Sequence, residues 1–231
     1  VMLIVRSVVP MVTALVVRPF IVMTAPALSD LACRIARTIN NGRAHVEPRF
    51  LLGDELNACR TDMSRVLSHV LIGGNSNEFQ SLQTELLHPD FRQQPGLPFG
   101  SLLDQLEELR LALADSTGRT LLEGGGLHLM HYPVGSKFMR HVDEDPHLFE
   151  PIRNSISFLI YLTEDDWSAD DGGALRIFNG DEEPQHVLPL GGTLVVYDST
   201  MEHEVLKTQR ERVLISGRFK ELNDDWKMGR S

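Results

Sequence analysis

The chain has 231 residues and a formal net charge of −10 at pH 7. This length favours one sizeable domain with a core of its own. The excess of negative charge argues against a nucleic acid or an anionic membrane surface as the main partner, because both require a basic face. Cys33 and Cys59 are the two cysteines. They provide no disulfide framework and fit a reducing compartment, so a cytoplasmic location is favoured.

The N-terminal segment differs from the rest of the chain, since residues 1–29 contain no Asp or Glu. The uncharged run between Arg6 and Arg18 is eleven residues long. It is too short to span a bilayer, which takes about 20 apolar residues, so no membrane span is expected. It is long enough for the apolar part of a signal peptide. Residues 1–18 are therefore interpreted either as a secretory or organelle-directing leader or as an N-terminal arm.

The first elements are a short strand in "RPFIVM", residues 18–23, and a helix over residues 27–42. Ser29 or Asp30 is expected near the start of the helix and Gly42 at its end. The apolar stripe of this helix consists of Leu28, Leu31, Ala32, Ile35 and Ile39.

Loop signals follow in "GGNSN", residues 73–77, and in the Pro-bearing segment 88–100. The next helix is predicted over residues 101–118, with Ser101 as its N-cap. Its buried face consists of Leu102, Leu103, Leu106, Leu109 and Leu113.

Short β-rich runs separated by Gly, Pro and Asp turns begin at Leu127. They are "LHLMHY", "SISFLIYL", "ALRIF", "HVLPL", "TLVVYD" and "RVLISGRF". This spacing is typical of a sandwich or barrel. The prediction is a mainly β fold with supporting helices, formed by a single domain over residues 19–226. A helical layer over 27–118 would support a β-barrel core over 127–220.

His141 and Asp143 stand two positions apart in "MRHVDED". On a strand, residues i and i+2 point to the same face, so both side chains could ligate one metal ion. His203 follows the strand "TLVVYD" and supplies a third candidate ligand. Two histidines and one carboxylate form the triad that holds non-haem Fe(II) and leaves positions open. A solvated polar turn is the alternative for an isolated H-x-D.

Arg212 begins the last strand, nine positions after His203. Alternation places Arg212, Leu214 and Ser216 on one face and the residues between them on the other. An inward Arg in an apolar barrel is costly unless it meets an anion. Its planar fork could bind one end of a dicarboxylate whose other end chelates the metal.

Two tyrosines, Tyr161 in "SFLIYL" and Tyr132 in "MHYPVG", could donate hydrogen bonds to the same dicarboxylate. Each could equally be a core residue whose hydroxyl is satisfied elsewhere.

The order of the motifs "YPVGSKFMRHVD", "YLTEDDW", "DGGALRIF" and "HEV" resembles that of the Fe(II)- and 2-oxoglutarate-dependent dioxygenases. The likeness runs from about Leu127 to Phe219 and is greatest to the prolyl 4-hydroxylase branch, in particular the oxygen-sensing prolyl hydroxylases. The resemblance implies a double-stranded β-helix, the jelly-roll, cupin-like barrel, with a tight turn at residues 171–173.

The resemblance also implies roles for six residues. These are His141, Asp143 and His203 as catalytic iron ligands, Arg212 and Tyr161 at the distal carboxylate of 2-oxoglutarate, and Tyr132 at its metal-chelating end. Fe(II), 2-oxoglutarate and O₂ would be the cofactors and cosubstrates, with ascorbate (vitamin C) as reductant.

The implied reaction is hydroxylation of a prolyl residue in a protein, with release of succinate and CO₂. The halogenating relatives lack the carboxylate ligand, so Asp143 favours hydroxylation. The substrate would enter through loops around residues 72–98 and 144–155. Hydroxylation of a small molecule or free amino acid is the alternative, and a monomer is expected.

Three further residues are assigned to the substrate side: Arg153, His128 and Arg218. Arg153 stands where the sensing enzymes have a basic residue near the mouth of the site. Arg218 and His128 depart from the family, which has an aromatic residue near the iron and an apolar pocket residue at these places. Collagen-type enzymes hold 2-oxoglutarate with Lys, whereas this chain has Arg212.

Two other functions use the same residues. A zinc-binding jelly-roll hydrolase or isomerase could use the three ligands, but it leaves Arg212 and Tyr161 without an anion. A binding module with a degenerate site does not account for the complete triad.

Overall fold

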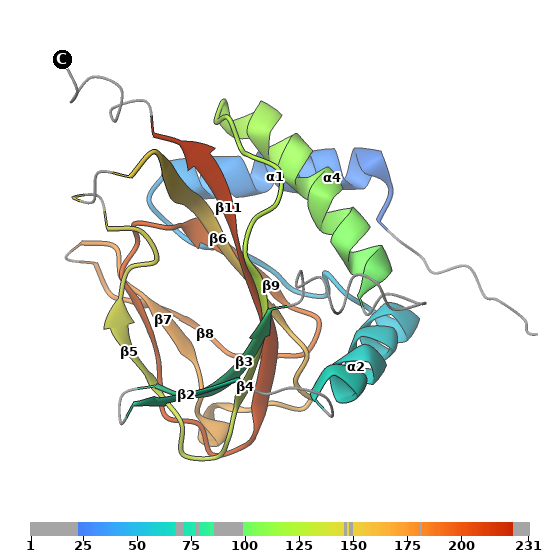
Figure 1. The fold of residues 1–231 in the computed structure, drawn as a ribbon, viewed down its shortest axis with the longest axis vertical. Coiled ribbons are helices and arrows are strands. Elements are labelled where there is room, and N and C mark those ends of the chain that lie inside the picture. Colours follow the sequence, from blue (N-terminus) through green and yellow to red (C-terminus); the bar gives the residue numbers. More distant parts are fainter. Residues whose placement is uncertain are drawn as a thin grey trace, which may run out of the picture.

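The computed structural model describes residues 23–67, 72–76, 79–85, 99–145, 147, 150–180 and 182–223. It shows a large antiparallel β-sheet with helices gathered on one side (Figure 1). Within these residues, no helix has the length and apolarity needed to cross a membrane.

The sheet contains eleven strands, all paired antiparallel, in the order β1-β9-β6-β11-β4-β3-β5-β10-β7-β8, with β2 paired to β3. The strands are β1 (His45–Glu47), β2 (Ile72–Ser76), β3 (Phe79–Glu85), β4 (Leu127–Tyr132), β5 (Phe138–His141), β6 (Ile152–Tyr161), β7 (Leu175–Ile177), β8 (Gln185–Val187), β9 (Leu194–Asp198), β10 (His203–Val205) and β11 (Arg212–Leu222). Each of the six β-rich runs expected after Leu127 overlaps one of these strands.

Both predicted helices are present, with earlier starts. Helix α1 (Ala25–Asn40) begins before Ser29 because Pro26 fits the first turn, where no backbone N–H is needed. Gly42 follows its end with φ 69°, as a stop residue does. Helix α4 (Gly100–Thr117) is preceded by Phe99 and not capped by Ser101. The backbone N–H of Phe99 donates to Asp62 Oδ2 at 2.7 Å, and this contact positions the start of α4.

Other local predictions need correction. Residues 72–76 form strand β2, which pairs with β3, so "GGNSN" does not mark a loop there and a hairpin replaces part of the predicted entry loop. Helix α2 (Gly53–Leu67) and strand β1 were not predicted. The segments 18–22 and 86–98 lie outside the described residues. The "DGG" turn is present after a 3₁₀ turn, η1 (Ala169–Asp171), with Gly172 and Gly173 at φ 66° and 67°.

The two faces of β11 contribute to two different cores. Val213 and Ile215 pack with residues of α1 and α4, whereas Leu214 packs with Leu175 of β7 and Val205 of β10. The sheet is therefore folded so that its two ends share an inner core, as in the predicted double-stranded β-helix. In Figure 1, β5, β7 and β8 lie on the side opposite the helices. The inner core faces the candidate site.

Candidate functional site

The pairing of β5 with β10 brings two histidines together. His203 is the register partner of His141, and their ring centroids are 4.2 Å apart. His203 is 4% exposed, because it lies in β10 between β5 and β7. Backbone register, and not sequence proximity, thus joins residues that are 62 positions apart in the sequence.

Asp143 completes a cluster with these histidines. Its Oδ1 lies 3.8 Å from His141 Nε2, and its Oδ2 lies 3.7 Å from His203 Nε2. The three potential ligand atoms lie within 4.8 Å of one another. Strand β5 ends at His141, so Asp143 belongs to the turn after the strand. The prediction that both side chains face the same way holds, although only one of the two residues is in the strand.

Both imidazoles are oriented by backbone carbonyl groups. His141 Nδ1 lies 2.8 Å from the Met139 oxygen, and His203 Nδ1 lies 3.0 Å from the Met201 oxygen. A carbonyl oxygen can only accept, so in each ring Nδ1 carries the proton. The Nε2 atoms are left with their lone pairs toward Asp143. This is the arrangement in which an imidazole ligates a metal ion.

The carboxylate of Asp143 receives two hydrogen bonds from other strands. Arg218 of β11 donates to Oδ1, and the Tyr197 hydroxyl donates to Oδ2 at 3.2 Å. Burial raises the pKa of Asp143, but the positive charge and the hydrogen bond of Arg218 outweigh it and leave this pKa below its usual value. Burial also lowers the pKa of His203. Near neutral pH the cluster thus presents an ionised carboxylate and a neutral imidazole.

Arg212 is completely buried on the same side of the sheet. Its Nη2 donates to the Tyr161 hydroxyl at 3.4 Å, while Nε and Nη1 have no hydrogen-bond partner. The guanidinium lies 4.8 Å from the ring centroid of Tyr132 and 5.2 Å from that of Tyr161. Among the described residues no carboxylate forms an ion pair with it. A buried cation with free donors favours an anionic ligand.

The histidine cluster and Arg212 line one narrow cavity of about 60 Å³. Among its lining residues are Tyr132, His141, Asp143, His203, Arg212 and Arg218. Tyr161 is 0% exposed and contacts Arg212 from outside this lining. The three potential metal ligands and Arg212 therefore line the same cavity.

The remaining substrate-side candidates lie apart from the cavity lining. Arg153 forms an ion pair with Glu221 at 2.7 Å and lines a separate polar cleft. His128 is the register partner of Ser216 and is half-buried on β4. Of the three candidates, Arg218 alone lies at the cluster, where it contacts Asp143.

Tyr197 is a site residue that the sequence reasoning missed. Its hydroxyl lies 3.2 Å from both Asp143 Oδ2 and His203 Nε2, and the residue is 1% exposed. A signal was present in the strand "TLVVYD", where alternation places Tyr197 on the same face as Val195, in the inner core.

The donor set fits a non-haem iron ion. Two imidazole nitrogens and one carboxylate could hold Fe(II) and leave coordination positions open, and the unpaired guanidinium of Arg212 suits the far end of a chelating dicarboxylate.

Comparisons with known proteins agree with this geometry. The family model for the 2OG-Fe(II) oxygenase superfamily matches residues 127–220. No curated protein sequence matches the chain. A solved prolyl-4-hydroxylase from Pseudomonas putida is 26% identical, with a TM-score of 0.73, and the alignment covers 83% of this chain and 100% of that one.

Two further solved structures share the fold at lower identity. A prolyl hydroxylase from Trichoplax adhaerens, in complex with a hypoxia inducible factor peptide, is 16% identical with a TM-score of 0.73, covering 88% of this chain and 94% of that one. A non-heme α-ketoglutarate-dependent carbocyclase from nogalamycin biosynthesis is 17% identical with a TM-score of 0.62, and the alignment covers 90% of this chain and 93% of that one. Proteins with this fold thus include enzymes named for peptide and for small-molecule chemistry.

Proposed function

We propose that this protein is a 2-oxoglutarate-dependent hydroxylase that acts on a prolyl residue of a protein or peptide, because residues 127–220 match the family model for the 2OG-Fe(II) oxygenase superfamily and the fold is similar to that of a prolyl-4-hydroxylase. The observation that carries the proposal is the buried Arg212, which lies in the same cavity as the histidine cluster and forms no ion pair with a carboxylate of the described residues. A zinc hydrolase would have no use for such a cation.

In this proposal the three clustered residues hold Fe(II). His141 and His203 bind through Nε2, the atom that their backbone hydrogen bonds leave free, and Asp143 binds through its carboxylate. Arg218 and Tyr197 keep that carboxylate ionised and oriented. Metal binding near neutral pH does not require His203 to lose a proton, because burial lowers its pKa and already favours the neutral ring.

Arg212 and Tyr161 bind the distal carboxylate of 2-oxoglutarate, and Tyr132 lies toward its chelating end. The guanidinium has two nitrogens without partners, which matches a carboxylate that accepts two hydrogen bonds. The apolar inner core, which includes Leu214 and Leu175, surrounds Arg212 and the bound carboxylate. It excludes water and so strengthens the ion pair between them.

When bound, Fe(II) with 2-oxoglutarate and O₂ supplies the oxidation of an unactivated C–H bond, with succinate and CO₂ as coproducts. The protein supplies orientation and exclusion of water. Ascorbate is included as the reductant that maintains Fe(II). A prolyl substrate is favoured over a small molecule because the most similar structure described above, at 26% identity, is a prolyl-4-hydroxylase.

The cosubstrate is tested by anaerobic titration of the Fe(II)-loaded protein with 2-oxoglutarate, monitored by the visible metal-to-ligand charge-transfer band. We expect the band with wild type, none with His141→Ala, and at least about tenfold weaker 2-oxoglutarate binding with Arg212→Ala. Arg210→Ala is the matched control, since this side chain pairs with Asp166 outside the cavity. Metal-loaded wild type without a band would contradict the proposal and favour the zinc enzyme.

The substrate is tested separately by incubation with proline-containing peptides and with free proline, with and without ascorbate. Mass spectrometry should detect a gain of one oxygen on a peptidyl proline, matched by an equal amount of succinate. Oxidation of the free amino acid alone would instead support the small-molecule alternative.

A further inference from the structure

A second, polar cleft lies beside the candidate metal centre. Its volume is about 620 Å³, and it is lined by residues of β6, β9, β11 and the turn after β5. Asp143 lines the inner cavity, while the next two residues, Glu144 and Asp145, line this cleft. Consecutive Cα atoms are about 3.8 Å apart, so the cleft begins one residue away from the candidate metal ligand.

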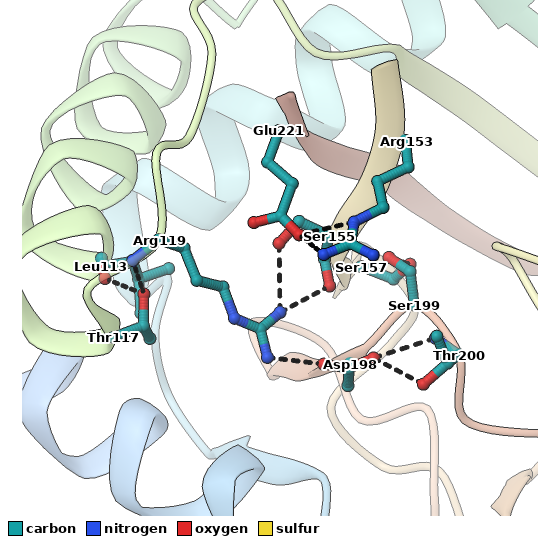
Figure 2. Close-up of polar contacts among 10 residues, drawn as sticks. All are labelled: Leu113, Thr117, Arg119, Arg153, Ser155, Ser157, Asp198, Ser199, Thr200 and Glu221. Carbon is teal, nitrogen blue, oxygen red and sulfur yellow. Dashed lines mark hydrogen bonds and ion pairs between the residues drawn. The ribbon is translucent and has the colours of Figure 1, made fainter. Parts of the chain in front are cut away.

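The two guanidinium groups of the cleft are neutralised within it (Figure 2). Arg119 forms an ion pair with Asp198 at 2.6 Å and donates to the backbone oxygen of Ser155 at 3.0 Å. Arg153 forms an ion pair with Glu221 at 2.7 Å. Neither arginine therefore offers free positive charge to an anionic ligand.

Two further carboxylates of the cleft are not neutralised. Glu144 accepts the backbone N–H of Asn154 at 2.8 Å, and Asp145 accepts that of His147 at 2.9 Å. Among the described residues neither forms an ion pair with a cation. Both stand on the turn that follows β5, at the side of the cleft that adjoins Asp143. The cleft thus carries an uncompensated negative charge next to the reaction site.

An independent feature also calls for a hydrogen-bond donor. Asn223 lines the cleft and is 9% exposed, and its Oδ1 atom is buried without a hydrogen-bond partner. A buried carbonyl oxygen that lacks a donor is unfavourable, and a ligand N–H group would satisfy it. The acceptor and the two carboxylates point to the same ligand chemistry: a positively charged group with several N–H donors.

We propose that this cleft binds a guanidinium or ammonium group of the substrate. Glu144 and Asp145 hold its charge, and Asn223 Oδ1 accepts one of its N–H groups. The inference rests on the proposed function and narrows it: the target proline lies within a few residues of an Arg or Lys in a peptide. A free basic amino acid is the other source of such a cation, and the two sources are distinguished below.

The test measures binding of fluorescent alanine-rich peptides with one central proline, by anisotropy, to the anaerobic protein loaded with Fe(II) and 2-oxoglutarate. A single Arg is placed in turn at each position up to four residues from the proline, and each peptide is paired with one that carries neutral citrulline instead. At the best position we expect about fivefold to tenfold tighter binding of the Arg peptide. Glu144→Gln/Asp145→Asn should abolish the difference between the Arg and citrulline peptides.

The control variant Glu108→Gln/Asp170→Asn removes the same amount of charge from exposed residues outside the cleft lining and should retain the preference. The charge-transfer band in both double variants shows that the metal centre is intact.

Two results together would overturn the cleft assignment even if the oxygenase function holds. The Arg and citrulline peptides would bind with equal affinity at every position, and the binding of free arginine would not depend on Glu144 and Asp145. If free arginine binds at least as tightly as the best Arg peptide, the cation belongs to a free amino acid and not to a peptide. Preference for Arg without any charge-transfer band would support the cleft and contradict the oxygenase.

Discussion

Tyr197 gives the candidate metal centre a polar group beyond its three ligands. Its hydroxyl lies equally near the Asp143 carboxylate and His203 Nε2. Burial, followed by the negative charge of Asp143, raises the pKa of Tyr197 well above its usual value. The phenol therefore keeps its proton and donates to the carboxylate, which restricts the orientation of Asp143 before any ion binds.

Tyr197→Phe should weaken metal binding by about tenfold, because groups that orient metal ligands typically contribute 10- to 100-fold to affinity. Anaerobic titration with Co(II) measures the change. Tyr161→Phe is the matched control: it removes another buried hydroxyl, but one that contacts Arg212. We expect that variant to bind 2-oxoglutarate more weakly and the metal normally. Equal metal affinity in wild type and Tyr197→Phe would show that the hydroxyl has no orienting role.

Single residues differed in how far the sequence could place them. The face of Arg212 followed from alternation along one strand, which is a local property. The contact of Arg218 with Asp143 depends on how β11 and the turn after β5 meet across the fold, so this arginine was assigned only to the substrate side. Tyr197 was missed for the same reason. Its strand was predicted, but the groups opposite it were not.

At the scale of elements, an ion pair helps to hold the segment after α4 against the β-sheet. Arg119 follows the helix and pairs with Asp198 at the end of β9, where Thr200 also donates to the carboxylate at 2.7 Å. Figure 2 shows Arg119 between this carboxylate and Ser155. Burial raises the pKa of Asp198, but the hydrogen bonds from Thr200 and Arg119 outweigh it and lower this pKa.

Asp198→Asn should lower the free energy of unfolding at pH 7 by about 1–3 kcal/mol. A carboxylate whose pKa is lower in the folded state stabilises above its unfolded pKa of about 4, and this contribution is lost as the pH falls below it. The difference from wild type should therefore shrink toward pH 3 in urea unfolding curves. Asp165→Asn, which removes a mostly exposed partner of Arg60, should change stability by less than about 0.5 kcal/mol. A pH-independent effect of Asp198→Asn would contradict the ionic contribution.

The elements that the sequence could not predict are those that depend on tertiary contacts. Helix α2 has few apolar residues, and those it buries include Leu56, Cys59 and Val66, so its periodicity is weak. Strand β2 contains two adjacent glycines, which in isolation indicate a turn, and it is a strand here because it pairs with β3. The six predicted β-rich runs after Leu127 each overlap a strand, whereas the short strands β5 and β10 are not among them, because each has only three or four residues and is held by pairing with its neighbours.

At the scale of the whole molecule, the candidate metal centre lies where two parts of the sheet meet. His141 and His203 come from the adjacent strands β5 and β10, which form one end of the sheet with β7 and β8. Arg218 and Tyr197, which contact Asp143, come from β11 and β9 in the other part. An ion bound by the three ligands would therefore connect both parts of the fold as well as support chemistry.

Metal binding should accordingly stabilise the whole protein. A ligand present at 100 times its Kd adds about 2.7 kcal/mol to the free energy of unfolding. In a protein of this size each kcal/mol raises Tm by about 2–4 °C, so we expect a rise of about 5–10 °C with Co(II) in a calorimetric scan. His203→Ala should abolish the rise, whereas the exposed His186→Ala should retain it. A Tm that does not respond to metal in wild type, or that responds equally in His203→Ala, would place the ion elsewhere. The same scan repeated with 2-oxoglutarate should add a further rise only when metal is present and Arg212 is intact, because the cosubstrate needs both ends of the cavity.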